Sequence, residues 1–170
     1  PKDPYLLTHK TKITKPNLIT TARQINDYMP GHIVKITLQA LKNVGKNIEK
    51  SEITVLGTAY KANIDDPRLS PSKPIIQKLL NLGAKVVAYD PYCPESFNAE
   101  KAESLLEAIK ESDCIVVATD HPEFEEMSLV ELRKLMRNRP VIVDGRRIVE
   151  PSEAEKNGFI YYRRGYAVRK

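Results

Sequence analysis

Residues 55–71 of the chain read VLGTAYKANIDDPRLSP, an apolar run followed by a polar loop. The apolar residues 53–56 predict a buried strand, Gly57 permits a sharp exit from it, and Ser72 begins a predicted helix. The amide groups at a helix N-terminus and nearby Lys or Arg side chains both favour negative charge. The loop carries Lys61 and Arg68 as candidate cations. This strand, loop and helix therefore predict an anion site.

From residue 51 onward, strand and helix patterns alternate along the chain. Short runs rich in Val and Ile predict strands at 53–56, 86–89, 114–118, 141–143 and 159–162. Helical patterns separate them at 72–82, 99–110, 128–136 and 152–157. Gly83 and Gly158 are typical of left-handed helix ends. The alternation predicts an α/β fold, a Rossmann-like parallel sheet with helices on both faces and right-handed crossovers.

A different pattern precedes this alternation. An irregular leader is predicted as far as Pro16, and apolar residues at three- and four-residue spacing then predict a long amphipathic helix. Pro30 removes a backbone hydrogen bond inside it, so we expect a kink or two abutting helices there. The chain thus divides into a leader (1–17), a linking helix of the dimerisation type (18–50) and a Rossmann-like domain (51–170). The apolar face of the helix is expected to pack on its own domain or on a second subunit.

The charge balance indicates which partners to expect. The chain carries 27 Lys and Arg against 22 Asp and Glu, a net charge of +5. This surplus suits an anionic small ligand, although a mildly basic surface explains most of it. Basic residues alternate with acids and form no basic stripe, which argues against nucleic acid. No apolar run reaches the ~20 residues of a membrane-spanning helix, so we expect no membrane partner.

Cysteine and histidine usage argues against a disulfide framework and against a metal centre. Cys93 and Cys114 are too few for a disulfide framework in a chain of 170 residues, which predicts a reducing cytoplasmic location. Cys114 lies in an apolar run and is expected in the core, whereas Cys93 lies in a turn, a position that leaves its exposure open. The histidines, His9, His32 and His121, stand apart, so we expect no metal ligand cluster.

The first crossover lacks the glycine-rich fingerprint that binds dinucleotides, because Thr58, Ala59 and Tyr60 follow Gly57. We therefore do not expect this domain to hold NAD in the usual Rossmann manner. Asp90 stands where such domains place a ribose-binding acid, but Asp90-Pro91 is an ordinary turn former, and we favour a turn role. Ligands of parallel sheets bind at the carboxyl ends of the strands, and Lys61, Asp90, His121 and Arg146 are all expected at that edge. For His121, a helix-entry turn explains the residue without a ligand role.

Four segments resemble, in order, the C-terminal domain of the NAD-dependent UDP-sugar dehydrogenases. They are PKDPYLL (1–7), ARQINDYMP (22–30), the loop at 55–71 and DGRR (144–147). The resemblance covers almost the whole chain. It implies oxidation of the C6 alcohol of a UDP-sugar to a uronic acid, with two NAD reduced and a catalytic cysteine as nucleophile. In the family that cysteine precedes the proline matching Pro1, so we expect the nucleophile and the NAD domain upstream and this chain alone to be inactive.

The resemblance also implies residue roles. Lys61 and Tyr60 match residues that bind the UDP-sugar, and Arg146 matches an arginine that contacts it across a domain interface. Arg68 matches an arginine that reaches NAD on the other domain. The residues themselves leave alternatives open: a solvated Lys61, a core ring for Tyr60, and a local ion pair of Arg68 with Asp65 or Asp66.

The opening segment matches residues that flank the catalytic cysteine. Asp3 is the candidate for positioning the hydrolytic water, with a turn role as the alternative, and Lys2 is the candidate for assisting the NAD-linked step. The segments at 1–7 and 25–27 look more like the branch acting on UDP-N-acetylhexosamines, especially UDP-N-acetyl-D-mannosamine, than the UDP-glucose branch. UDP-glucose 6-dehydrogenase and a non-catalytic nucleotide-sugar-binding module remain alternatives. We also expect a homo-oligomer, because family sites are completed between subunits.

Overall fold

The structure is a computed structural model that describes residues 3–9 and 16–165. Before the sheet come α1 (Asp3–His9), α2 (Asn17–Asn43) and the short 3-10 helix η1 (Ile48–Lys50). The strands are β1 (Glu52–Leu56), β2 (Lys85–Tyr89), β3 (Glu100–Lys101), β4 (Cys114–Val117), β5 (Val141–Asp144) and β6 (Ile160–Arg163). The helices between them are α3 (Ser72–Asn81), α4 (Leu105–Ile109), α5 (Pro122–Glu125), α6 (Leu129–Leu135) and α7 (Pro151–Lys156).

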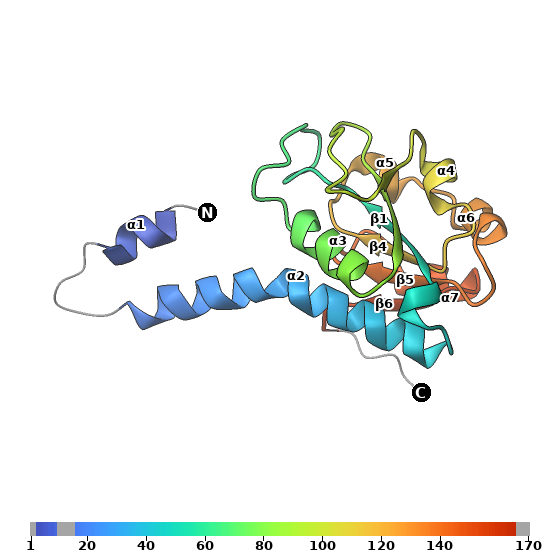
Figure 1. Cartoon of the computed structure of the whole chain (residues 1–170), viewed down its shortest axis with the longest axis horizontal. Helices are drawn as coiled ribbons and strands as arrows, with labels where there is room; N and C mark the ends of the chain where they lie inside the picture. Colours follow the sequence, from blue (N-terminus) through green and yellow to red (C-terminus); the bar gives the residue numbers. More distant parts are fainter. Residues whose placement is uncertain (1–2, 10–15, 166–170) are drawn as a thin grey trace.

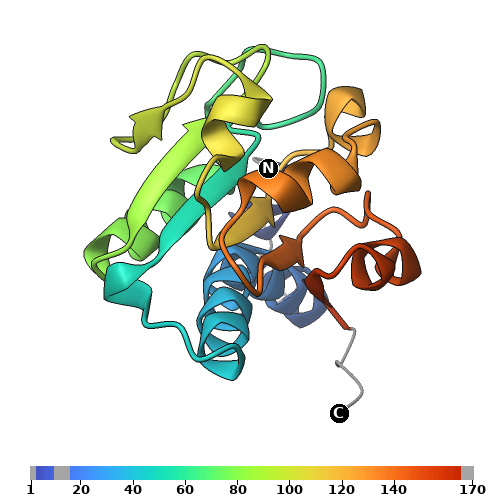
Figure 2. The same cartoon turned by 90° about the vertical axis from the view of Figure 1, so that its right-hand side faces the viewer.

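The strands form a six-stranded sheet in the order β3-β2-β1-β4-β5-β6, and every neighbouring pair is parallel. Residues of β1, β4 and β5 are buried throughout because helices cover both faces of the sheet. Figure 2 shows this layered arrangement. The predicted Rossmann-like α/β fold is confirmed.

Alternate residues of each strand serve opposite faces of the sheet. Ile53 and Val55 of β1 pack in one cluster with α2 and α3, whereas Leu56 joins the cluster that includes α6 and α7. This period of two is the backbone geometry of a strand. Since both faces are apolar, the polar groups that serve function are left to the loops at the strand ends.

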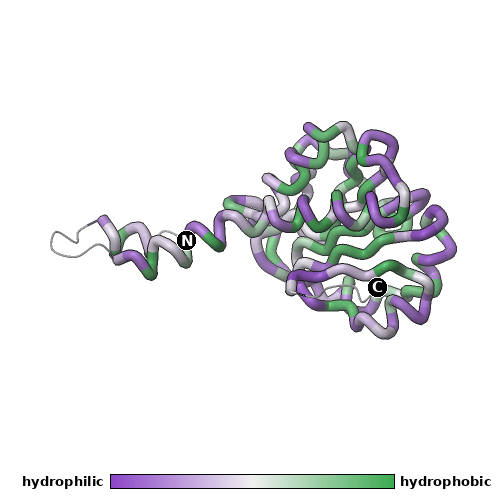
Figure 3. Tube along the Cα trace, turned by 90° about the horizontal axis from the view of Figure 1, so that it is seen from below, coloured by the Kyte–Doolittle hydropathy of each residue, from purple (hydrophilic) through white to green (hydrophobic). Residues whose placement is uncertain are grey.

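The long helix α2 has two halves with different environments. Its buried residues all lie in the second half, at Ile33, Val34, Thr37, Ala40 and Leu41. The first half extends away from the sheet together with α1 (Figures 1 and 3). The expectation of two abutting helices is wrong, because α2 runs without a break through Pro30. Packing of the following turns on the sheet offsets the one hydrogen bond that a proline removes.

Several local predictions need correction. The leader is not wholly irregular, since Asp3–His9 form α1. The helix predicted at 99–110 is wrong at its start: residues 100–101 pair with β2 as the edge strand β3. The helix begins only after Ser104, whose Oγ accepts a hydrogen bond from the amide of Glu107 at 3.2 Å. The left-handed conformations expected at Gly83 and Gly158 are confirmed by φ angles of 85° and 81°.

Within residues 3–9 and 16–165, no helix is both long enough and apolar enough to span a bilayer.

Candidate functional site

The loops after β1, β2, β4 and β5 meet at the carboxyl edge of the sheet, which is where open α/β folds bind ligands. The first of them leaves β1 at Gly57, whose φ is 89°. A Cβ atom there would lie 2.3 Å from Cβ of Thr119 in the β4 loop. Glycine at this position therefore allows the two loops to approach each other closely.

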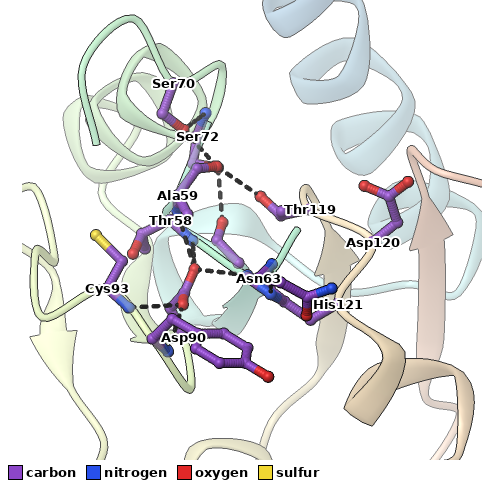
Figure 4. A network of polar contacts seen from close by, with 12 residues as sticks. Thr58, Ala59, Asn63, Ser70, Ser72, Asp90, Cys93, Thr119, Asp120 and His121 are labelled. Atoms are coloured by element: carbon purple, nitrogen blue, oxygen red, sulfur yellow. Dashed lines mark hydrogen bonds and ion pairs between the residues drawn. The ribbon is translucent and has the colours of Figure 1, made fainter. Parts of the chain in front are cut away.

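The carboxylate of Asp90, after β2, joins three of these loops (Figure 4). Its oxygens accept hydrogen bonds over 2.7–2.9 Å from the main-chain amides of Thr58, Ala59, Tyr92 and Cys93. Burial alone would raise the pKa of Asp90, but the hydrogen bond from His121 and those backbone amides outweigh it and hold the pKa well below its ordinary value. The turn role predicted for Asp90 is confirmed, because it accepts the amides of Tyr92 and Cys93 in its own turn. Asp90 also bonds to the β1 loop, which the turn role alone does not explain.

His121 completes this junction from the β4 loop. Its side chain is fully buried, its Nε2 lies 3.0 Å from Oδ2 of Asp90, and its Nδ1 accepts a hydrogen bond from the amide of Asn63 at 3.2 Å. Because Nδ1 accepts, the proton lies on Nε2 and points at Asp90. Its ring stacks on Tyr92 at 5.1 Å and meets the edge of Phe124 at 5.4 Å.

Hydroxyl groups fix the rest of the β1–α3 loop. Thr119 Oγ1 donates to the carbonyl of Ala59 at 2.8 Å, and Ser72 Oγ donates to the carbonyl of Gly57 at 2.6 Å. The amide of Tyr60 donates to the carbonyl of Asp66 at 2.8 Å, which closes the loop on itself. A polar loop of this length is thus ordered by contacts at both ends.

Lys61 and Tyr60 lie at the outer turn of this loop. The Nζ atom of Lys61 lies 5.8 Å from the centre of the Tyr60 ring, and Lys61 is exposed while Tyr60 is half-buried. Within the described ranges, Lys61 forms no ion pair. Its ammonium group is therefore available to an anionic ligand.

Arg68 takes part in a local ion pair. Its Nε and Nη2 donate to the two oxygens of Asp66, each at 2.8 Å, and its side chain is 85% exposed. The hydrogen bonds from the Arg68 side chain and amide lower the pKa of Asp66 to about 2. The local pair weighed as an alternative for Arg68 is present, and such an exposed pair costs little to exchange for another anion.

The DGRR segment forms a second ordered loop, after β5. The buried carboxylate of Asp144 accepts from the amides of Arg146, Arg147 and Val149 at 2.6–2.9 Å and from the hydroxyl of Tyr161 at 3.0 Å. Burial and the neighbouring Asp144 charge raise the pKa of Tyr161. Arg147 has a φ of 66°, which turns the chain sharply after Arg146.

The guanidinium of Arg146 reaches back to the β4 loop. Its Nε and Nη2 donate to Oδ1 of Asp120 at 3.0 and 2.6 Å. Asp120 precedes His121, which contacts the β1 loop at Asn63. The structure thus connects the loops that carry Lys61 and Arg146 through the short β4 loop, as their positions after parallel strands predicted.

The opening residues stand apart from this edge. Asp3 begins α1, which lies away from the sheet (Figure 1). The Tyr5 hydroxyl of α1 donates to Asp27 of α2 at 3.2 Å. Lys2 lies outside the described residues. Among the described residues, Asp3 lies on α1 and not on the loops that carry Lys61 and Arg146, and the roles expected of Asp3 and Lys2 stay predictions.

The cysteines are both free and buried. For Cys114 this confirms the expected core position, and burial raises the pKa of its thiol. The exposure of Cys93, which its position in a turn left open, is only 2%, and the main-chain amide of Cys93 donates to Asp90. In the described part of the chain, no group of His, Cys, Asp and Glu could hold a metal ion.

A separate hollow of about 420 Å³ lies between the α5–α6 segment and α7. Its lining includes the carboxylates of Glu125, Glu150 and Glu153. Carboxylates repel phosphate groups. The acidic lining of this hollow therefore disfavours a phosphate group there.

Sequence reasoning did not find the long-range partners at this edge. These are the bonds of Asp90 and His121 to the β1 loop, the pair of Asp120 with Arg146, and the anchoring of the DGRR loop by Asp144. One signal was available: Asp90 and Asp144 each end an apolar strand directly before a turn residue. A carboxylate in that position is a common acceptor for loop amides.

A Rossmann-like sheet with cations at its carboxyl edge defines a nucleotide-binding class of domain. The sequence profile described as UDP-glucose/GDP-mannose dehydrogenase family, UDP binding domain, matches residues 54–151. The chain belongs to this family. The predicted resemblance to UDP-sugar dehydrogenases is thereby confirmed.

Individual relatives agree with this assignment. The chain is 39% identical over 160 residues to a UDP-N-acetyl-D-mannosamine dehydrogenase of Methanococcus vannielii, covering 92% of the chain and 36% of the relative. It is 35% identical over 151 residues to a UDP-glucose 6-dehydrogenase of Bacillus subtilis, covering 85% and 32%. The solved structure of the UDP-D-ManNAc dehydrogenase from Pyrococcus horikoshii superposes with a TM-score of 0.85 at 36% identity, covering 95% and 36%. The chain therefore spans about a third of the length of these relatives.

Proposed function

We propose that the carboxyl edge of this sheet binds the UDP part of a UDP-sugar. Lys61 and Arg146 contact the diphosphate, and Tyr60 lies against the same ligand. The observation that carries the proposal is the position of both cations, on ordered loops that the β4 loop joins at the ligand-binding edge of a UDP-binding family domain. A diphosphate would also replace Asp120 as the partner of Arg146, because arginine binds phosphate in a bidentate manner.

The complete polypeptide is then an NAD-dependent dehydrogenase that oxidises the C6 alcohol of UDP-N-acetyl-D-mannosamine to the uronic acid and reduces two NAD. The names of relatives such as the Methanococcus vannielii enzyme support this substrate. The Bacillus subtilis relative supports UDP-glucose as the alternative. Comparing kcat/KM of the complete enzyme for the two UDP-sugars decides between them, and equal inactivity on both would leave a non-catalytic nucleotide-sugar-binding module.

NAD itself does not fit this domain in the Rossmann manner. The first loop lacks the required glycines, and the Asp90 carboxylate that would receive a ribose already accepts four main-chain amides. We therefore assign NAD mainly to another domain of the complete polypeptide. Arg68 on the exposed loop, together with Lys2, reaches the cofactor from this side, and Asp3 positions the hydrolytic water.

We also propose a homo-oligomer located in the cytoplasm. Helix α1 and the first half of α2 extend away from the sheet. Large apolar side chains are exposed on them, among them Leu6, Leu7, Leu18, Ile25 and Tyr28. Exposed apolar patches of this kind support burial against another surface. Light scattering by the complete protein tests the oligomer, and a monomer would contradict it.

Calorimetric titration with UDP tests the binding proposal. The chain is expected to bind UDP saturably, and Lys61→Ala and Arg146→Ala each to weaken binding by about 10- to 100-fold, the range of a charge-assisted hydrogen bond. Lys134→Ala is the matched control, because this exposed lysine lies in the last turn of α6, which leads to the opposite edge of the sheet. Equal affinity in all three variants would refute the assignment of Lys61 and Arg146.

A further inference from the structure

The proposed function leaves a buried pair of residues without a role in binding. Neither Asp90 nor His121 exposes its side chain, so neither can touch a ligand at the surface in this conformation. A buried carboxylate and imidazole are costly to keep unless their hydrogen bonds are satisfied. Here every one of those hydrogen bonds is made within or between loops. The loop that carries Lys61 receives three of them, at Thr58, Ala59 and Asn63.

The pair holds this loop on both sides of Lys61. On the preceding side, Asp90 accepts the amides of Thr58 and Ala59 at 2.7 and 2.9 Å. On the following side, His121 accepts the amide of Asn63 at 3.2 Å. The bond between His121 Nε2 and Asp90 at 3.0 Å joins the two supports into one unit (Figure 4).

Asn63 has a backbone conformation that is uncommon for a residue other than glycine. Its φ is 61°, in the left-handed region, which asparagine adopts more readily than most residues, and within residues 3–9 and 16–165 its exposed side chain forms no hydrogen bond. A non-glycine residue persists in that region when its surroundings over-determine it. The bond to His121 is a direct restraint on this residue, two positions after Lys61.

We propose that Asp90 and His121 are positioning residues for UDP binding, which hold residues 58–63 in the conformation that presents Tyr60 and Lys61 to the ligand. This inference rests on the proposed function. A loop that is ordered before binding loses less conformational entropy when the ligand arrives, and the gain appears as affinity. A purely structural pair would instead change the stability of the fold and leave the affinity of folded molecules unchanged.

Three variants of the chain separate these roles. His121→Phe retains an aromatic ring beside Tyr92 and Phe124 but removes both hydrogen bonds. His121→Gln retains an amide that can accept from Asn63 and donate to Asp90. Phe124→Leu is the matched control, because it weakens the packing around His121 and leaves both bonds in place. Each is titrated with UDP at a temperature where circular dichroism shows a folded protein.

His121→Phe is expected to bind UDP roughly 10-fold more weakly than the wild type. His121→Gln is expected to retain most of the wild-type affinity. Phe124→Leu is expected to melt at a lower temperature and to bind UDP with unchanged affinity. Hydrogen exchange of the Asn63 amide is expected to accelerate in His121→Phe only. Wild-type affinity in folded His121→Phe, or equal weakening in Phe124→Leu, would overturn the positioning role alone. Absence of UDP binding by the wild-type chain would overturn the proposed function and, with it, this inference.

Discussion

The two edges of the sheet use the same kinds of charged residue in opposite ways. At the amino edge, the buried carboxylate of Asp113 lies 2.9 Å from Lys46 Nζ and 2.9 Å from Arg137 Nη1, and it accepts the amide of Glu52. At the carboxyl edge, Asp90 and Asp144 accept mostly main-chain amides. The buried acid at the first edge neutralises cations. The buried acids at the second edge order loops instead, and Lys61 is left without an ion pair in the described part of the chain. The first arrangement serves stability, and the second is suited to an anionic ligand.

The largest effect is expected where the carboxyl-edge loops are closest. Gly57→Ala combines a left-handed φ of 89° with a Cβ placed 2.8 Å from the main-chain nitrogen of Thr119. Strain and overpacking together are expected to lower the free energy of unfolding by about 3 kcal/mol or more. Gly45→Ala, at the other end of the sheet, has a φ of 78° but open space around it, and about 1 kcal/mol is expected. Urea denaturation measures both, and equal losses would remove the close approach as the cause.

Next in size is the loss of a loop anchor. Asp144→Ala leaves the amides of Arg146, Arg147 and Val149 without their acceptor, and about 3 kcal/mol of unfolding free energy is expected to be lost. Because this loop carries Arg146, UDP affinity is expected to fall as well. Asp65→Ala, an exposed carboxylate on the other loop, serves as the control and should change neither quantity. A destabilised Asp144→Ala variant that bound UDP normally would contradict the link between anchor and site.

The amino edge should respond differently. Asp113→Asn leaves Lys46 and Arg137 without their buried carboxylate, and a loss of about 2–3 kcal/mol in unfolding free energy is expected. UDP affinity of the folded variant is expected to remain at the wild-type value, because no ligand-edge loop depends on this residue. Denaturation and calorimetric titration of the same preparation test the two halves of this prediction. If Asp113→Asn also lost UDP affinity, the two edges would not have separate roles in stability and binding.

Acid should weaken both edges. For Asp113, burial would raise the pKa, but the amide of Glu52 and the nearby Lys46 outweigh it and lower the pKa, as the amides and His121 do for Asp90. An aspartate in the unfolded chain titrates near a pKa of about 3.9. The stabilisation is therefore complete above that pH and is lost as the pH falls through the lower folded values. The urea midpoint of unfolding should therefore fall as the pH is lowered from neutral to acid, and it should fall less steeply in Asp113→Asn than in the wild type. An identical pH dependence in the two proteins would exclude Asp113 as a source of the acid sensitivity.

The smallest effect is expected at the exposed pair of Arg146. Asp120→Asn removes the charged partner of Arg146, and an exposed ion pair contributes only about 0–1 kcal/mol to stability. The freed guanidinium is expected to bind UDP a few-fold more tightly at low salt, with the gain disappearing at high salt. Weaker binding in this variant would mean that Asp120 orients Arg146 for the ligand and does not compete with it.

Much of the fold followed from local patterns because a parallel sheet covered on both faces needs continuous apolar strands. The strands at residues 53–56 and 141–143 were predicted within one residue of their observed bounds. The edge strand β3 was missed, since its two residues, Glu100 and Lys101, are polar and exposed. They pair with β2 through the main chain and through one exposed ion pair of Glu100 with Lys85, so no apolar side-chain pattern marks the strand.

The candidate site likewise has features that the sequence predicted and features that it did not. Its cations could be named from the sequence because charge and position after a strand are local properties. The partners of Asp90 in the β1 and β4 loops could not, because those residues lie 31 or more positions away in the chain.

The sequence by itself determined the alternation of strands and helices, the family, and which residues stand at the carboxyl ends of the strands, since these depend on side-chain order along one chain. The tertiary structure alone decided that α2 passes unbroken through Pro30, that Arg146 pairs with Asp120, and that Asp90 and His121 are bonded to the loop of Lys61. Hydrogen bonds between distant loops form only when the sheet sets the strand ends side by side, so no local pattern encodes them.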